Sequence, residues 1–284
     1  MAETIALFGG TGATGKYFLK LALEGGFKVQ AMVRSKDKVQ EEYKENPSLT
    51  LTEGDFTNTE AITATVKNAN YVVCMAGGPM GKAKEDYPAN LMLNFVTSLA
   101  TIVKDTAPSV KVLLYQAGAF SVLPGKSLGF FQNTIKTVVG EWIMKLGPNV
   151  EDNNNVIKHI QENKGTLGFQ TIVSRPAALT DKPSKETLVA DHFNAPNFPI
   201  TFTDLAAWSL KAIQDESLYG TYPYVQPVAK DWLAGFNAMM KPTIDKVAVP
   251  VTETTQGVTK PVTEKTDMVV EGLARGGNES ESKP

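Results

Sequence analysis

The sequence predicts an α/β fold in which a doubly wound, mainly parallel β-sheet carries helices on both faces. Short runs of apolar and β-branched residues alternate along the chain with stretches whose apolar residues recur at helical spacing. These runs are continuously apolar, as expected for strands that are buried on both faces. The first run ends at a glycine-rich turn that opens the first helical stretch. The alternation of strands and helices implies right-handed crossovers between parallel strands.

The strands are expected where the apolar runs stop at glycines or polar loop residues. In chain order they span residues 4–8, 27–33, 49–52, 71–75, 110–115 and 169–174, with a further short strand at 200–202. Helices are expected between them at 14–24, 36–44, 59–67, 89–104 and 154–163, and a last helix begins near Asp204. Asn58 is of a residue type that caps helices and precedes the third of them. A further amphipathic stretch at 128–146 contacts either the core or a partner with its apolar face.

Composition and charge exclude several classes of function. The 28 Lys and Arg residues are balanced by 30 Asp and Glu residues, and no basic run is present, so nucleic-acid binding is not expected. A single cysteine, Cys74, excludes a disulfide framework and a thiolate cluster, and only two histidines are present, so no metal site is expected. No run reaches the roughly 20 apolar residues that a membrane span needs, and no signal peptide is recognisable. We therefore expect a cytoplasmic protein that does not enter membranes.

The chain is long enough for one large α/β domain. We expect residues 1–240 to form a single nucleotide-binding domain that also carries small acceptor-site elements. From 241 to 284, Val, Thr, Pro, Lys and Glu dominate, which is typical of a flexible, disordered tail; docking of residues 247–251 as an edge strand is the alternative. We expect a monomer or a weak homodimer.

The glycine-rich turn points to a dinucleotide. It fits two spacings at once, Gly10-x-Gly12-x-x-Gly15 and Gly9-x-x-Gly12-x-x-Gly15, and it lies directly between the first strand and the first helix. Glycines let backbone N–H groups approach the pyrophosphate, and the helix N-terminus adds a partial positive charge. The residues expected to hold the cofactor here are Gly9, Gly10, Thr11, Gly12, Ala13, Thr14 and Gly15. The sequence therefore predicts a Rossmann-type fold.

The residues after the second strand indicate NADP(H). NAD-binding sites usually place a carboxylate there for the ribose hydroxyls, whereas this chain has Arg34-Ser35. A guanidinium binds a 2′-phosphate that a carboxylate would repel, although Arg34 as an ordinary solvated residue is the alternative. After the third strand, Asp55 either accepts a hydrogen bond from the adenine amino group or caps the next segment, and Phe56 lies beside it. After the fourth strand, Ala76-Gly77 leaves room for a cofactor ribose.

Several of these segments resemble a known family. GGTGATG at 9–15, Val33-Arg34, Gly54-Asp55, SRPAAL at 174–179, TDLA at 203–206 and GTYP at 220–223 are similar to motifs of the atypical short-chain dehydrogenases. The likeness covers roughly residues 4 to 226 and is strongest to the NAD(P)H-binding, NmrA-like group that includes biliverdin reductase B, a flavin reductase. The resemblance implies a Rossmann fold, NADPH with Pro176 among its contacts, and a small planar acceptor over the nicotinamide.

The catalytic residues of the family match less well. None of the eight tyrosines is followed four residues later by lysine, so the usual Tyr-x-x-x-Lys pair is absent. The flavin reductase branch has a serine after the fifth strand and a histidine beside a lysine on a later helix. Here Gly118 takes the place of that serine, with Ser121 displaced from it. Lys158 is retained, and His159 lies one place along the helix. Lys158, His159 and Ser121 are therefore the candidate catalytic residues, with exposed surface positions as the alternative for the first two.

Two functions remain open from the sequence. The first is an NADPH-dependent oxidoreductase that transfers hydride to a small aromatic, flavin- or quinone-like acceptor. Gly118, Phe120 and Ala177 would line the acceptor pocket, with the Phe120 ring as a flat wall. The second is a non-catalytic NADP(H)-binding redox sensor or scaffold, which the missing serine and tyrosine favour.

Overall fold

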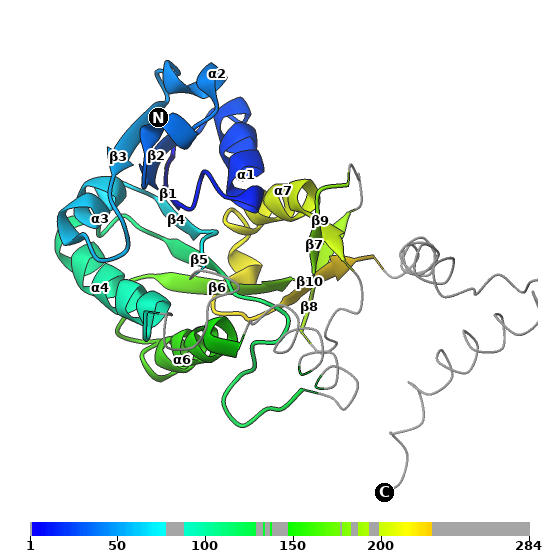
Figure 1. Ribbon diagram of the computed structural model, residues 1–284. Helices are drawn as coiled ribbons and strands as arrows, with labels where there is room; N and C mark the ends of the chain where they lie inside the picture. Colours follow the sequence, from blue (N-terminus) through cyan, green and yellow to red (C-terminus); the bar gives the residue numbers. More distant parts are fainter. Residues whose placement is uncertain are drawn as a thin grey trace, which may run out of the picture. The chain divides into compact units, whose positions relative to one another are not determined.

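The computed structural model describes residues 2–77, 88–128, 133, 137, 147–176, 178–182, 187–192 and 199–228 (Figure 1). All of them belong to the first of the two units into which the chain divides, Met1–Ala238 and Met239–Pro284. The predicted tail at 241–284, the alternative strand at 247–251 and most of the amphipathic stretch at 128–146 lie outside the described residues, as does Ala177.

The main sheet has the order β3-β2-β1-β4-β5-β6-β10-β8 in the described part of the chain. Its strands are β1 (Thr4–Phe8), β2 (Lys28–Val33), β3 (Leu49–Glu53), β4 (Tyr71–Cys74), β5 (Val112–Gln116), β6 (Gln170–Pro176), β8 (Leu188–Asp191) and β10 (Tyr224–Pro227). Neighbours pair in parallel except β8, which runs antiparallel to β10. A second, two-stranded sheet joins β7 (Leu179–Thr180) and β9 (Ile200–Thr201). This is the doubly wound parallel sheet that the sequence predicts.

Helices cover both faces of the sheet (Figure 1). On one face lie α1 (Ala13–Glu24) and α7 (Phe202–Ala212); on the other lie α3 (Thr59–Val66), α4 (Leu91–Thr106) and α6 (Gly147–Glu162). Short helices η1 (Lys36–Lys38), α2 (Glu41–Lys44) and η4 (Glu216–Leu218) lie in the connections. As predicted, Asn58 caps α3, its side-chain oxygen accepting from the Ala61 backbone N–H at 2.9 Å.

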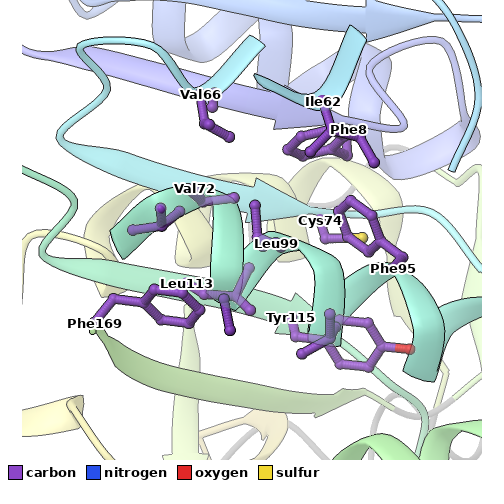
Figure 2. Packing of buried hydrophobic residues seen from close by; sticks show 14 of the residues in the cluster. Phe8, Ile62, Val66, Val72, Cys74, Phe95, Leu99, Leu113, Tyr115 and Phe169 are labelled. Carbon is purple, nitrogen blue, oxygen red and sulfur yellow. The ribbon is translucent and has the colours of Figure 1, made fainter. Parts of the chain in front are cut away.

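The core under α3 and α4 is aromatic at the end of β1 (Figure 2). The Phe8 and Phe95 rings are buried, meet edge to face with centroids 4.9 Å apart, and Phe56 lies 4.7 Å from Phe95. Such pairs contribute about 0.5–1.5 kcal/mol beyond their buried area. They fix the carboxyl end of β1, from which the glycine turn departs, against α4.

Two of the expected helices differ from the sequence-based expectation. The helix expected at 36–44 is divided into η1 and α2, because Val39 between them is extended and buries its side chain. Helix α6 begins at Gly147, two turns before residue 154. Pro148 is accommodated because the first turn of a helix has no acceptor for that missing N–H.

Strands β8 and β10 were not expected at all, and they extend the sheet beyond β6 at its carboxyl end. Among the described residues, none of the helices has the length and apolar character needed to cross a bilayer. In the same part of the chain, no group of three or more metal-ligating side chains comes together.

Candidate functional site

The glycine turn between β1 and α1 is built from close backbone contacts. Gly9 has a φ of +88°, and a Cβ there would lie 2.8 Å from both the Cβ and the backbone nitrogen of Ala76. A Cβ on Gly15 would lie 2.0 Å from the Gly9 carbonyl oxygen and 3.0 Å from the Gly10 Cα. These two positions need glycine for the turn itself, because neighbouring backbone occupies the space of a side chain.

Gly12 has a different role in the same turn. Its N–H donates to the Gly9 carbonyl at 2.9 Å, its φ of −77° suits any residue, and it is exposed. Gly12 is also the N-cap of α1 and contributes no side-chain cap, so the first amides of the helix, from Ala13 and Thr14, have no intrahelical acceptor. With the dipole of a twelve-residue helix behind them, these amides suit a pyrophosphate.

Arg34 lies where β2 ends, at the rim of an open hollow of about 580 Å³. The side chain of Arg34 is exposed, and the remaining lining residues are Gly54, Asp55, Thr57, Asn58 and Glu60. Gly54 allows the β3–α3 loop to pass under α3, since a Cβ there would lie 2.4 Å from the Ala61 Cβ. Ser35 is half-buried and precedes η1. The structure thus brings Arg34 and Asp55 to one hollow. That they contact the 2′-phosphate and the adenine stays a prediction.

Asp55 forms a tight turn with Thr57. Its Oδ1 atom accepts from the Thr57 N–H at 2.8 Å and from the Thr57 hydroxyl at 2.6 Å. The hydroxyl bond, followed by the backbone bond, holds the pKa of the Asp55 carboxyl below its usual value. The turn leads into Asn58, the cap of α3, so Asp55 organises the rim of the hollow; its contact with adenine stays a prediction.

The ends of β4, β5 and β6 leave space beside the glycine turn. Among the described residues, a Cβ on Gly118 would meet nothing within 4 Å, and one on Gly77 would lie 3.8 Å from the Asn149 Oδ1 atom. Phe120 is half-buried in the loop after β5. Pro176 is buried at the end of β6, and its carbonyl accepts from the Ala119 N–H at 2.9 Å.

Burial raises the pKa of the Cys74 thiol at the end of β4 to about 12, so this cysteine is not a thiolate at neutral pH.

The three candidate catalytic residues are not joined by any hydrogen bond or ion pair in the described part of the chain. Lys158 is on the outer face of α6, 61% exposed, with its Nζ atom 3.9 Å from the Glu162 carboxylate. The His159 ring lies 3.3 Å from the Asn163 side-chain nitrogen, one turn along the helix. Ser121 is 1% exposed, and its hydroxyl oxygen has no hydrogen-bond partner among the residues that the structure describes. Their catalytic roles stay predictions that this geometry does not support.

Sequence reasoning overlooked the polar face of α6 that is directed at the sheet. Asn153 Oδ1 accepts from the Tyr115 hydroxyl at 2.6 Å, and Asn149 lies four residues earlier, beside Gly77. Asp152 accepts from the first amides of α4, with its two carboxylate oxygens 2.9 Å and 3.1 Å from the backbone nitrogens of Met92 and Leu93. The run Glu151-Asp152-Asn153-Asn154-Asn155 looks solvated in sequence, and only the fold reveals that Asp152 is buried and that Asn153 reaches Tyr115.

Arg175 belongs to the SRPAAL motif at 174–179, where the sequence assigns it no role of its own. In the structure it is one of the most buried charged residues, at 3% exposure. Its guanidinium donates to the Tyr222 and Ser121 carbonyls and stacks on the Tyr224 ring, with Cζ 3.7 Å from the ring centroid. It therefore connects β6 with the loop after β5 and with β10.

Comparisons with known proteins agree with this geometry. A family model described as NAD(P)H-binding matches residues 9–216, whereas no curated protein matches the chain.

Three solved structures with similar folds are reductases or dehydrogenases. ChuY, an anaerobillin reductase from Escherichia coli, aligns with a TM-score of 0.60 at 15% identity, over 80% of this chain and 98% of that one. A short-chain dehydrogenase/reductase from Veillonella parvula in complex with NADP aligns at 0.59 and 14%, over 81% and 96%. Yeast methylglyoxal/isovaleraldehyde reductase Gre2, complexed with NADPH, aligns at 0.55 and 16%, over 78% and 77%. At these identities the likeness shows the fold.

The family match begins in the glycine turn, includes Arg34 and the hollow beside it, and ends in η4. It covers well over half of the chain. The chain therefore belongs to the NAD(P)H-binding family and binds NAD(P)H.

Proposed function

We propose that the protein is an NADPH-dependent reductase that transfers hydride to a small aromatic, flavin- or quinone-like acceptor. One observation carries the proposal. Among the described residues, side chains leave space at Gly77 and Gly118, at the carboxyl ends of β4 and β5 and on the side of the glycine turn that we expect to hold the dinucleotide. A planar acceptor has room there, and Phe120 supplies an aromatic surface at the same loop.

The preference for NADPH over NADH rests on the hollow at the end of β2. The exposed Arg34 guanidinium at its rim suits a 2′-phosphate, to which it can donate charge-assisted hydrogen bonds. The carboxylate that would bind the ribose hydroxyls of NADH is absent from position 34.

The chemistry required of the protein is modest. The bound cofactor supplies the hydride, and the acceptor takes two electrons with it. Flavins and quinones complete their reduction with a proton that solvent can provide, so no Tyr-Lys pair is needed. The chain's own residues then hold the two reactants face to face and exclude water. We place Asn149, rather than the solvated Lys158, beside the nicotinamide half of the cofactor, because Asn149 faces Gly77.

A second candidate is a non-catalytic NADP(H) sensor. It is favoured by the enclosed Ser121 hydroxyl and the solvated Lys158, neither of which is placed as a proton donor in the described part of the chain. In either case we expect the protein to be cytoplasmic. We also expect a monomer or weak homodimer, and light scattering on a size-exclusion column would test this oligomeric state.

The two candidates are separated by one experiment. Purified full-length protein is first titrated calorimetrically with NADPH and NADH, and NADPH is expected to bind more tightly. Oxidation of NADPH is then followed with a panel of free flavins, quinones and aliphatic aldehydes. Turnover with the planar acceptors but not with the aldehydes supports the reductase; tight NADPH binding without oxidation by any acceptor supports the sensor.

A further inference from the structure

Arg175 is a buried cation without a carboxylate partner in the described part of the chain. It lies near the carboxyl end of β6 and is 3% exposed. Burial lowers the pKa of its guanidinium, which still remains protonated at any physiological pH. Removing a charge from water is costly, and an apolar residue of similar length would fill the same space without that cost. The hydrogen bonds that the guanidinium N–H groups donate must therefore explain why position 175 is an arginine.

The donors of Arg175 connect three segments that are distant in sequence. Nε and Nη2 donate to the Tyr222 carbonyl at 2.9 Å and 2.5 Å, and Nη1 donates to the Ser121 carbonyl at 3.3 Å. The plane of the guanidinium lies over the Tyr224 ring, which belongs to β10. A lysine could not form this arrangement, because it has neither the flat fork nor donors fixed in two directions.

Ser121 is the far end of the loop that carries Gly118 and Phe120. The backbone N–H groups of Ala117 and Ala119 donate to the carbonyls of Ser174 and Pro176, both at 2.9 Å. The Ser121 N–H turns back to the Gly118 carbonyl at 2.9 Å. In the described part of the chain a Cβ at Gly118 would meet nothing within 4 Å, so these hydrogen bonds, together with that of the Val122 N–H to Asn154 Oδ1 at 2.9 Å, are what place the loop. Arg175 binds this loop at the Ser121 carbonyl and connects it to β10.

We propose that Arg175 is the positioning residue of the acceptor-binding loop, holding residues 118–121 at a fixed distance from the cofactor. The proposal rests on the proposed reductase function for its kinetic consequence, but the positioning itself is independent of turnover. Small displacements of a loop that orients a reactant cost about tenfold to hundredfold in rate. Cofactor binding, which occurs at the glycine turn and at Arg34, is expected to be unaffected.

The test compares Arg175→Met, Arg175→Lys and Tyr224→Leu with the wild-type protein. Lys111→Met is the matched control, because it removes a cation at the amino ends of the parallel strands, just before β5, where Lys111 pairs with Glu3 at 2.8 Å. Hydrogen exchange of full-length, NADPH-bound protein is measured by mass spectrometry. Arg175→Met is expected to speed exchange of the amides at 117–122 by about tenfold or more, while β1 and β4 stay protected. Arg175→Lys and Tyr224→Leu should show smaller effects in the same direction, and they carry the test if Arg175→Met does not fold.

Kinetics with the best acceptor give the second measurement. In Arg175→Met, the acceptor KM is expected to rise by about tenfold or more, with the NADPH Kd changed by less than about twofold. Unchanged protection of the loop, or equal loss of protection throughout the sheet, would overturn the proposal. A wild-type protein that oxidises no NADPH, combined with selective loosening of the loop in Arg175→Met, would instead leave the positioning role intact and reject the reductase.

Discussion

Gly12 and Gly15 are three residues apart in one turn, but the structure predicts opposite consequences for their replacement. A Cβ on Gly15 would lie 2.0 Å from the Gly9 carbonyl oxygen, so helix and turn must separate by more than about 1 Å to restore ordinary contact. Overpacking of this kind costs on the order of 1–3 kcal/mol. For a domain of this size, each kcal/mol lowers Tm by about 2–4 °C. Gly15→Ala should therefore lower Tm by roughly 2–12 °C.

Gly12→Val should leave the fold nearly intact. In the described part of the chain, a Cβ there approaches the Gly9 carbonyl oxygen at 3.2 Å and no other atom within 4 Å, and the backbone angles suit an ordinary residue. The side chain would instead occupy the space in front of the α1 amides. Loss of two charge-assisted bonds to the pyrophosphate, at about 1.5–3 kcal/mol each, weakens NADPH binding by about a hundredfold or more.

Thermal unfolding and calorimetric titration of both variants measure these effects separately. Gly12→Val is expected to keep its Tm within about 4 °C of wild type and to lose NADPH affinity. If Gly12→Val binds NADPH normally while folded, the pyrophosphate is not at this turn. If Gly15→Ala unfolds at the wild-type temperature, the close contact does not determine the packing of α1.

Three further predictions concern other parts of the molecule. Arg34→Asp should weaken NADPH binding by about 1.5–3 kcal/mol and shift the preference towards NADH, and equal NADPH affinity in calorimetry would reject the role of Arg34. Phe120→Ala should reduce the steady-state rate of NADPH oxidation more than His159→Ala does; the reverse order would identify the histidine as an acid. Lys111 holds the pKa of the Glu3 carboxyl below its usual value, so that pair stabilises the fold at neutral pH and loses its effect as pH falls through the lowered pKa. Because both groups are partly exposed, Glu3→Gln should cost less than about 1 kcal/mol at pH 7, and this cost should shrink as the pH is lowered through the acidic range, as measured by denaturant unfolding.

The sequence was sufficient for the central strands and the glycine turn because both depend on local chemistry. Continuous apolar runs identify strands that are covered on both faces, and β1 has the predicted bounds of Thr4 to Phe8. The spacing of Gly9, Gly12 and Gly15 reflects close backbone contacts within a single turn, which any sequence with that turn must satisfy.

The remaining features depend on contacts between distant segments. Strand β10 follows Pro223 and ends at Pro227. It pairs with β6 and β8, which lie about fifty and thirty-five residues earlier in the sequence, so no local pattern identifies it as a strand. Burial of Arg175 is similarly decided by Tyr222 and Tyr224, so its sequence neighbours do not reveal it. Ser121 is a candidate catalytic residue by its place in the sequence, but the fold buries its side chain.

The Asp152 carboxylate determines where an anion can bind along the carboxyl edge of the sheet. Helices α1 and α4 both start at this edge, after β1 and β4, and each therefore presents a partial positive charge there. At α4 that charge is neutralised internally, because Asp152 accepts from the amides of Met92 and Leu93. At α1 the cap is a glycine that supplies no acceptor. The first amides of α4 are therefore already occupied by a carboxylate of the chain itself, whereas those of α1 have no acceptor from their N-cap side chain and can bind a phosphate.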